Sequence, residues 1–100
     1  MDERRVCGLI GLCVRAGLAV FGEEGCMKML RNGDGEILLL DSSISDASRE
    51  KYSGICRRAA IKVVLLPVNL LASATGRSAK AMAVHRSTLA DQLVHCFGEE

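Results

Sequence analysis

Apolar residues recur along this chain with two spacings, one typical of helices and the other of buried strands. Val6, Leu9, Ile10 and Cys13 are spaced as one face of a helix, and Gly17 is a plausible stop signal for it. Further helices are predicted to open at Gly22, to run from about Asp46 to Ala60 and over Leu70–Thr75, and to follow a cap at Ser87. Their inner faces are predicted to carry Cys26, Met29 and Leu30, then Tyr52, Ile55, Cys56 and Ala59, and last Leu89, Leu93, Val94 and Phe97.

Four short apolar runs predict strands, at Leu18–Phe21, Ile37–Leu40, Ile61–Leu66 and Ala81–Val84. The second run is continuously apolar, as expected of a strand that is covered on both faces. Pro67 ends the third run, because proline cannot donate to a ladder of hydrogen bonds. The alternation of helices and strands predicts an α/β fold, a small sheet between two helical layers. With 100 residues, the whole chain (1–100) is expected to form one domain.

Three predicted loops fall where ligand sites gather in folds of this class. Such sites lie at the carboxyl ends of strands and the amino ends of helices. Here those places are Phe21–Gly25, Asp41–Ser45 and Pro67–Ser73. We therefore expect any binding site at this end of the sheet.

The composition narrows the classes of function. Hydrophobic residues make up 49% and charged residues 25% of the chain, which favours a packed globular core over disorder. Thirteen basic and twelve acidic residues give a net charge of +1, so no whole-protein field attracts a polyanion, although a local basic face stays open. Only Phe21, Tyr52 and Phe97 are aromatic, which argues against a platform for stacked bases.

The residue types that carry catalysis or bind metals are poorly represented. The cysteines, Cys7, Cys13, Cys26, Cys56 and Cys96, form no C-x-x-C motif and lie near no pair of histidines, so we expect reduced core thiols and no metal. No phosphate-binding glycine motif occurs, and no nucleophile has an evident base beside it. The sequence therefore predicts a protein that is not an enzyme and needs no cofactor. With no targeting segment and no apolar run of about 20 residues, we expect a cytoplasmic location.

Basic residues are the remaining candidates for a functional surface. Lys28 and Arg31 are three positions apart, away from the apolar face of their helix. Arg15 precedes the first strand, and Arg77 and Lys80 flank the start of the fourth. These residues are either a solvated surface or contacts to the phosphates of a nucleic acid.

A longer pattern resembles a known family. The segment 15–24 reads RAGLAVFGEE, and with LIGL at 9–12 it resembles the LLGLARRAGKLVSGEE opening of small bacterial YlxQ-like proteins. These are a branch of the kink-turn-binding ribosomal protein family, written here as L-seven-Ae. The resemblance covers roughly residues 5–97 and ends in LASATGR at 71–77, which is similar to the family's LGxAxGR.

The resemblance implies a three-layer α-β-α sandwich with a small four-stranded mixed sheet. It also implies a non-catalytic RNA-binding protein that recognises a kink-turn, a sharply bent RNA element, in a ribosomal or ribonucleoprotein context. Gly22 matches the glycine that opens the RNA-facing helix, and Pro67–Ser73 is similar to a loop that packs against an extruded nucleotide. The implied RNA-binding residues are Gly22, Glu23, Glu24, Lys28, Arg31, Asp41, Ser42, Val68, Asn69, Ala72 and Ser73.

The sequence also departs from the family's pattern. Glu24 stands where the strongest RNA binders have an asparagine that reads a base edge, a contact worth about 1–3 kcal/mol. Leu18 replaces a lysine, and Phe21 replaces a small or basic residue. We therefore expect weaker kink-turn binding than in the ribosomal relatives. An exposed Leu18–Phe21 pair supports an alternative, a protein-interaction module on the same scaffold, such as a homodimer, with weak or lost RNA binding.

Overall fold

Five helices and four strands alternate along residues 1–98, the part of the chain that the computed structural model describes. In chain order they are α1 (Glu3–Arg15), β1 (Ala19–Phe21), α2 (Glu23–Arg31), β2 (Gly35–Asp41), α3 (Asp46–Ala59), β3 (Lys62–Leu66), α4 (Leu70–Thr75), β4 (Ala81–His85) and α5 (Thr88–Phe97). Every element that the apolar pattern predicts is present.

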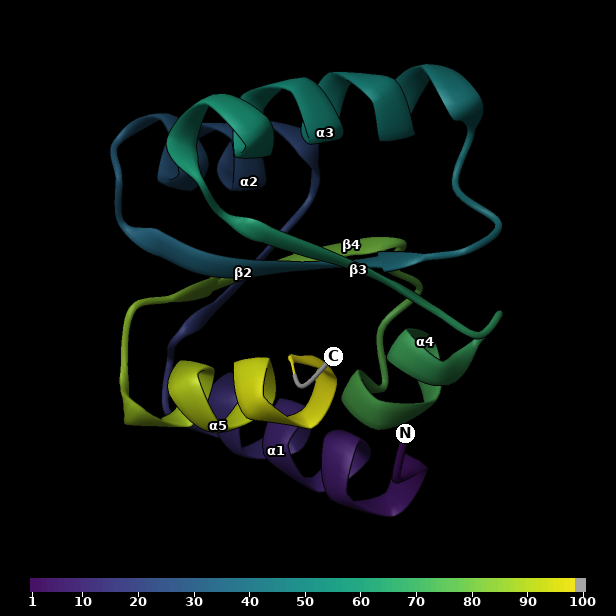
Figure 1. Ribbon diagram of the computed structural model, residues 1–100. Helices are drawn as coiled ribbons and strands as arrows, with labels where there is room; N and C mark the ends of the chain where they lie inside the picture. The colour runs from purple at the N-terminus through teal and green to yellow at the C-terminus, as the bar shows by residue number, and fades with distance from the viewer. Residues whose placement is uncertain (99–100) are drawn as a thin grey trace.

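The strands form one mixed sheet in the order β1-β4-β2-β3. Strand β4 is antiparallel to both of its neighbours, whereas β2 and β3 are parallel. Helices α2 and α3 cover one face of the sheet, and α1, α4 and α5 cover the other (Figure 1). The predicted three-layer α-β-α sandwich is thereby confirmed.

The strand directions bring distant loops to one end of the sheet. Phe21 pairs with Met82, and Asp41 pairs with Leu66, so β1, β2 and β3 all end where β4 begins. Helices α2, α3 and α4 begin at the same end. We call this end the loop edge: the residues that follow β1, β2 and β3 and those that precede β4.

Each face of the sheet has its own apolar core, and the buried strand β2 contributes to both. Ile37 and Leu39 pack towards α1, α4 and α5, whereas Leu38 and Leu40 pack towards α2 and α3. All four residues are fully buried, as the continuous apolar run predicted. Burial of each of these large side chains stabilises the fold by about 1.5–3 kcal/mol relative to leaving it exposed.

Three of the predicted inner faces each include at least one residue that the structure does not bury. Met27 is buried on α2 and Met29 only half-buried, because α2 packs against α3 as well as against the sheet. Ala59 is exposed in the last turn of α3, and Ala90 is buried on α5 where Leu89 was expected. Leu93 is buried as predicted, whereas Val94 and Phe97 pack half-buried against the core.

The predicted helix ends are confirmed by their backbone geometry. Gly17 and Gly76 both have φ of 73°, a left-handed conformation that glycine adopts without strain. Ser87 caps α5, where its Oγ accepts a hydrogen bond of 3.1 Å from the N–H of Ala90. Within residues 1–98, no helix combines the length and the apolar character that a membrane crossing requires.

Candidate functional site

A cleft of about 650 Å³ opens on the loop edge, on the side of the sheet that carries α2 and α3. One wall is the corner between β1 and α2, formed by Phe21, Gly22 and Glu23. A second wall is the start of α3 with the turn before it, and the third is the segment 77–80 that leads into β4. Three segments that are far apart in the sequence therefore line one open hollow.

The corner of the first wall depends on glycine. Gly22 precedes α2 with φ of 85° and ψ of 152°, a combination that only glycine adopts readily. Glu23 and Glu24 follow in the first turn, where acidic side chains favour the positive end of the helix. The backbone turn thus fixes where α2 starts and which side chains reach the cleft.

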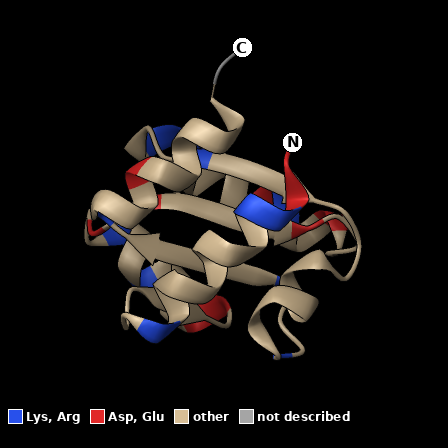
Figure 2. Cartoon of the chain, turned by 90° about the horizontal axis from the view of Figure 1, so that it is seen from below, with Lys and Arg blue, Asp and Glu red and all other residues tan. Residues whose placement is uncertain are grey.

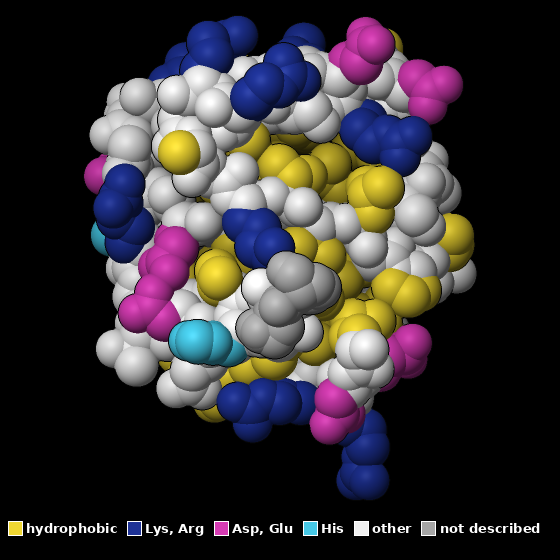
Figure 3. Space-filling view, viewed as in Figure 1, with side chains coloured by type: hydrophobic (Ala, Val, Ile, Leu, Met, Phe, Trp, Pro, Cys, Tyr) yellow, Lys and Arg dark blue, Asp and Glu magenta, His cyan; other side chains and the backbone are white. Residues whose placement is uncertain are grey.

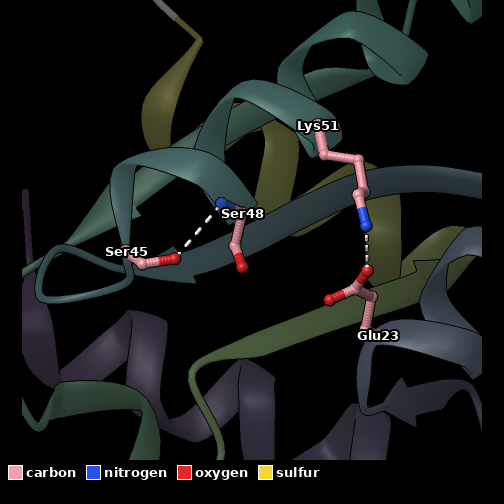
Figure 4. Close-up of polar contacts among 4 residues, drawn as sticks. All are labelled: Glu23, Ser45, Ser48 and Lys51. Atoms are coloured by element: carbon pink, nitrogen blue, oxygen red, sulfur yellow. Dashed lines mark hydrogen bonds and ion pairs between the residues drawn. The ribbon is translucent and has the colours of Figure 1, made fainter.

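Glu23 is held by a partner from another helix. Lys51 of α3 donates a hydrogen bond of 2.6 Å from Nζ to Oε2 of Glu23, and Figure 4 shows the two side chains meeting between the helices. Both side chains are about half exposed, so the pair is worth roughly 0–1 kcal/mol in stability. Its effect on charge matters more, because Lys51 offsets a carboxylate that lines the cleft.

The second wall is the amino end of α3. Ser45 caps this helix, and its Oγ accepts a hydrogen bond of 3.2 Å from the N–H of Ser48 (Figure 4). Both serines line the cleft together with Ile44 and Tyr52. Neighbouring N–H groups in the first turn of a helix have no partner within the helix, so this wall presents partial positive charge.

The third wall supplies two full positive charges, Arg77 and Lys80, which are absent from the set of RNA-binding residues that the family resemblance implies. The guanidinium of Arg77 lies 4.4 Å from the centre of the Phe21 ring, in a cation–π contact that joins this wall to the first. Lys80 is exposed and also lines the cleft. Both residues flank the fourth strand in the sequence, but only the strand order shows that β4 lies beside β1.

Asp41 organises the loop edge from inside. It is 3% exposed, and its Oδ1 accepts hydrogen bonds from the N–H of Ser43 at 2.8 Å and from its Oγ at 2.6 Å. Its Oδ2 accepts a bond of 2.8 Å from the N–H of Asn69, and its own N–H donates to the carbonyl of Lys80. The hydrogen bonds from Ser43, more than the one from Asn69, hold the pKa of Asp41 below its ordinary value. Its carboxylate is occupied by the chain itself, so we assign it a positioning role.

The structure separates the predicted site residues of the third loop from the cleft. Val68, Asn69 and Ser73 line a different hollow of about 420 Å³, together with Glu3 and Cys7 of α1. This hollow lies at the β3 end of the loop edge, beyond β2, whereas Gly22 lies at the β1 end. Ala72 is half-buried on α4, and Ser42 is exposed beside Asp41.

The other predicted residues are on α2 or close to it. Glu24 and Lys28 are exposed on α2. Arg31 is in its last turn, at the far end of a groove between α2 and α3 that it shares with Arg58. The expected exposed pair of Leu18 and Phe21 is wrong: both are half-buried against the core between the sheet and helices α1, α4 and α5. Part of their apolar surface is therefore used by this core, and Phe21 also lines the cleft.

The thiols behave as core residues. The cysteines are all unpaired, and Cys13, Cys26 and Cys56 are buried. Burial raises the pKa of Cys56 to about 11 and also raises the pKa of Cys13. Across the described residues, no group of three or more histidine, cysteine or acidic side chains could hold a metal ion.

Comparisons with known proteins bear on the fold. No family model matches the sequence, and no curated protein matches it. A protein of unknown function from Bacillus halodurans is 24% identical, with a TM-score of 0.86 over 94% of this chain and 97% of that one. The 15.5kD RNA binding protein of Giardia lamblia is 11% identical, with a TM-score of 0.77 over 96% of this chain and 88% of that one. At these identities the likeness concerns the fold, so the chain shares its fold with an RNA-binding protein.

Proposed function

We propose that this protein binds structured RNA without catalysis, and that it recognises an RNA bend of the kink-turn type in a ribosomal or ribonucleoprotein context. The observation that carries this proposal is the cleft on the loop edge, which joins the start of α2 to the cationic segment 77–80. The fold shared with the Giardia lamblia RNA-binding protein supports it.

The charges of the cleft suit a backbone of phosphates. The net charge is only +1, and acidic and basic residues are interspersed in the view from below (Figure 2), so attraction must be local. Arg77 and Lys80 supply it, the amino end of α3 adds partial positive charge, and Lys51 offsets Glu23. Phosphate contacts of this kind position a nucleic acid without reading its sequence.

The form of the cleft favours a bent RNA over a straight duplex. Its walls come from three separate segments around a hollow, so a ligand must present phosphates from more than one direction. Glu24 offers no amide donor to a base edge, so shape and charge carry the recognition. Neither His85 nor His95 lines the cleft, which leaves it without the most common general base.

A direct test compares a kink-turn RNA with a straightened, fully paired control of the same length. We expect tighter binding of the kink-turn, with an affinity that falls steeply as salt increases. Equal affinity for both RNAs would reject recognition of the bend, and no measurable affinity for either would reject RNA binding.

Single substitutions locate the surface. Lys80→Ala and Lys28→Ala should each weaken binding and make the slope of log affinity against log salt shallower by about 1, because each removes one phosphate contact. Arg58→Ala is the matched control, since Arg58 is exposed at the far end of α3 from the cleft. An effect of Arg58→Ala as large as that of Lys80→Ala would move the RNA away from the cleft.

A further inference from the structure

Strand β3 is an open edge of the sheet. It has β2 as its neighbour on one side, and no strand within residues 1–98 pairs with its other side. Figures 1 and 3 look onto this edge, and Figure 3 shows hydrophobic side chains in the middle of the face, with a Lys or Arg side chain among them and further charged residues around them. An open edge has backbone N–H and C=O groups without partners in the sheet, and these can pair with another strand.

The backbone groups that are free for pairing can be identified. The carbonyl of Leu66 accepts a hydrogen bond from the N–H of Ser42, so Leu66 directs its backbone towards β2. Backbone direction alternates along a strand, so Val64 also faces β2, whereas Val63 and Leu65 direct their N–H and C=O groups outward. These two residues offer two donors and two acceptors at the edge.

The side chains delimit a short apolar strip. Leu65 is 45% exposed, and Val63 and Val64 are half-buried. Lys62 stands at the start of the strip and Pro67 follows its end, two residue types that restrict open-ended pairing at sheet edges. These two residues therefore limit the length over which a partner strand can pair with β3.

We propose that β3 pairs with β3 of a second copy of this chain, antiparallel about a two-fold axis at Val64. In this register Val63 faces Leu65 of the second copy, and each such pair exchanges two hydrogen bonds. Symmetry repeats the pair, so every outward donor and acceptor of Val63 and Leu65 is satisfied. The two sheets become one continuous sheet with four strands from each copy.

The charges on α3 complement each other under the same symmetry. Asp46 and Arg57 are eleven positions apart, close to three helical turns, so they lie on one stripe of α3, with the acid near its start and the base near its end. Lys51 reaches α2 from another side of the helix, and neither Asp46 nor Arg57 lines the groove between α2 and α3. Because α3 runs antiparallel to itself across a two-fold axis, the acidic end of each copy lies towards Arg57 of the other. This match favours a second copy over an unrelated strand.

The dimer is expected to be weak. One short strand and the flank of one helix form a small interface, of the size found in transient complexes. Its formation does not depend on RNA binding, because the cleft lies at the ends of the strands and stays open in both copies.

Sedimentation velocity from low micromolar to millimolar protein provides the test. We expect a monomer that converts to a dimer as concentration rises. Leu65→Lys and Val63→Pro should remain monomeric throughout, the first by placing a charge in the strip and the second by removing an outward donor that β2 does not use. Leu12→Lys, at a residue 43% exposed on α1, is the matched control and should dimerise normally.

Two results would overturn the proposal: a wild-type protein that stays monomeric to millimolar concentration, or a dimer that persists in both β3 variants. Amide hydrogen exchange gives a check that needs no variant. The amides of Val63 and Leu65 should exchange more slowly as concentration rises, whereas that of Val64, already bonded to β2, should not change. Exchange of Val63 and Leu65 that is independent of concentration would contradict the pairing, even if the protein dimerises elsewhere.

Discussion

Replacement of Asp41 by asparagine tests how the loop edge is held together. The amide oxygen can still accept from Ser43, but the amide nitrogen must then point at the N–H of Asn69, donor against donor. A hydrogen bond to a charged group contributes about 1.5–3 kcal/mol, and a neutral one about 1 kcal/mol. One bond is lost and the others become neutral, so Asp41→Asn should destabilise the fold by about 3 kcal/mol.

Urea denaturation followed by circular dichroism measures this cost. A loss of about 3 kcal/mol is a large share of the 5–15 kcal/mol that typically stabilises a domain. With a slope of about 1.5 kcal/mol per molar urea, the midpoint should fall by about 2 M. Asp46→Asn is the control, because the Asp46 side chain is 99% exposed; its effect should stay within about 0.5 kcal/mol.

The pH dependence provides a second readout with a definite sign. The folded-state pKa of Asp41 lies below its ordinary value of 3.8, so ionised Asp41 stabilises the fold above that pH. The contribution is lost as pH falls through the lowered pKa. The difference between wild type and Asp41→Asn should therefore shrink as pH falls below about 4. A difference under about 1 kcal/mol at neutral pH, or one that does not change with pH, would refute this role.

Three further predictions concern the backbone, the caps and the thiols. Gly22→Ala should destabilise the fold by about 1–3 kcal/mol, because φ is 85° at this position. Gly8→Ala, in the middle of α1, should instead stabilise the fold by about 0.5–1 kcal/mol. An added Cβ meets nothing within 4 Å at either position, so thermal unfolding of the two variants measures the effect of backbone conformation alone. Ser87→Ala should cost about 1 kcal/mol in a urea titration, through the lost cap of α5; an unchanged midpoint would show that the cap adds nothing. The buried Cys56 thiol, with its pKa raised to about 11, should resist alkylation at pH 8 in the native protein. The half-buried Cys7 and Cys96 should react before it, as peptide mass spectrometry can show.

The fold was largely predictable because local signals agree with the final packing. Gly76 and Ser87 mark helix ends by their own conformational preferences, and the run at 37–40 marks a strand covered on both faces. Strand β2 is longer than predicted, since Gly35 and Asp41 join the ladder although neither is a large apolar residue. The buried face of a helix differs from the predicted one where the helix packs on two neighbours, as at Met27 of α2. The spacing of apolar residues indicates one buried face and does not show that a second neighbour covers another side of the helix.

The candidate site was predictable only in part. Gly22 and Glu23 were placed at the correct end of the sheet, because strand ends and helix starts are visible in the sequence. The inclusion of Arg77 and Lys80 depends on β4 lying next to β1, a long-range pairing that no local pattern encodes. Asp41 had the features of an exposed loop acid, and its bond to a backbone group 28 residues away could not be read from its neighbours.

The position of β4 also determines when the sheet can be completed during synthesis of the chain. The last strand to leave the ribosome lies between the first two, so β1 has no partner until Ala81–His85 has emerged. Contacts between such distant segments are costly to close and slow the search for the native state. An N-terminal fragment that ends before β4 would keep β2 and β3 side by side but would lack the strand that joins β1 to the sheet. The cleft is therefore completed only after the segment 77–80 and β4 have been synthesised.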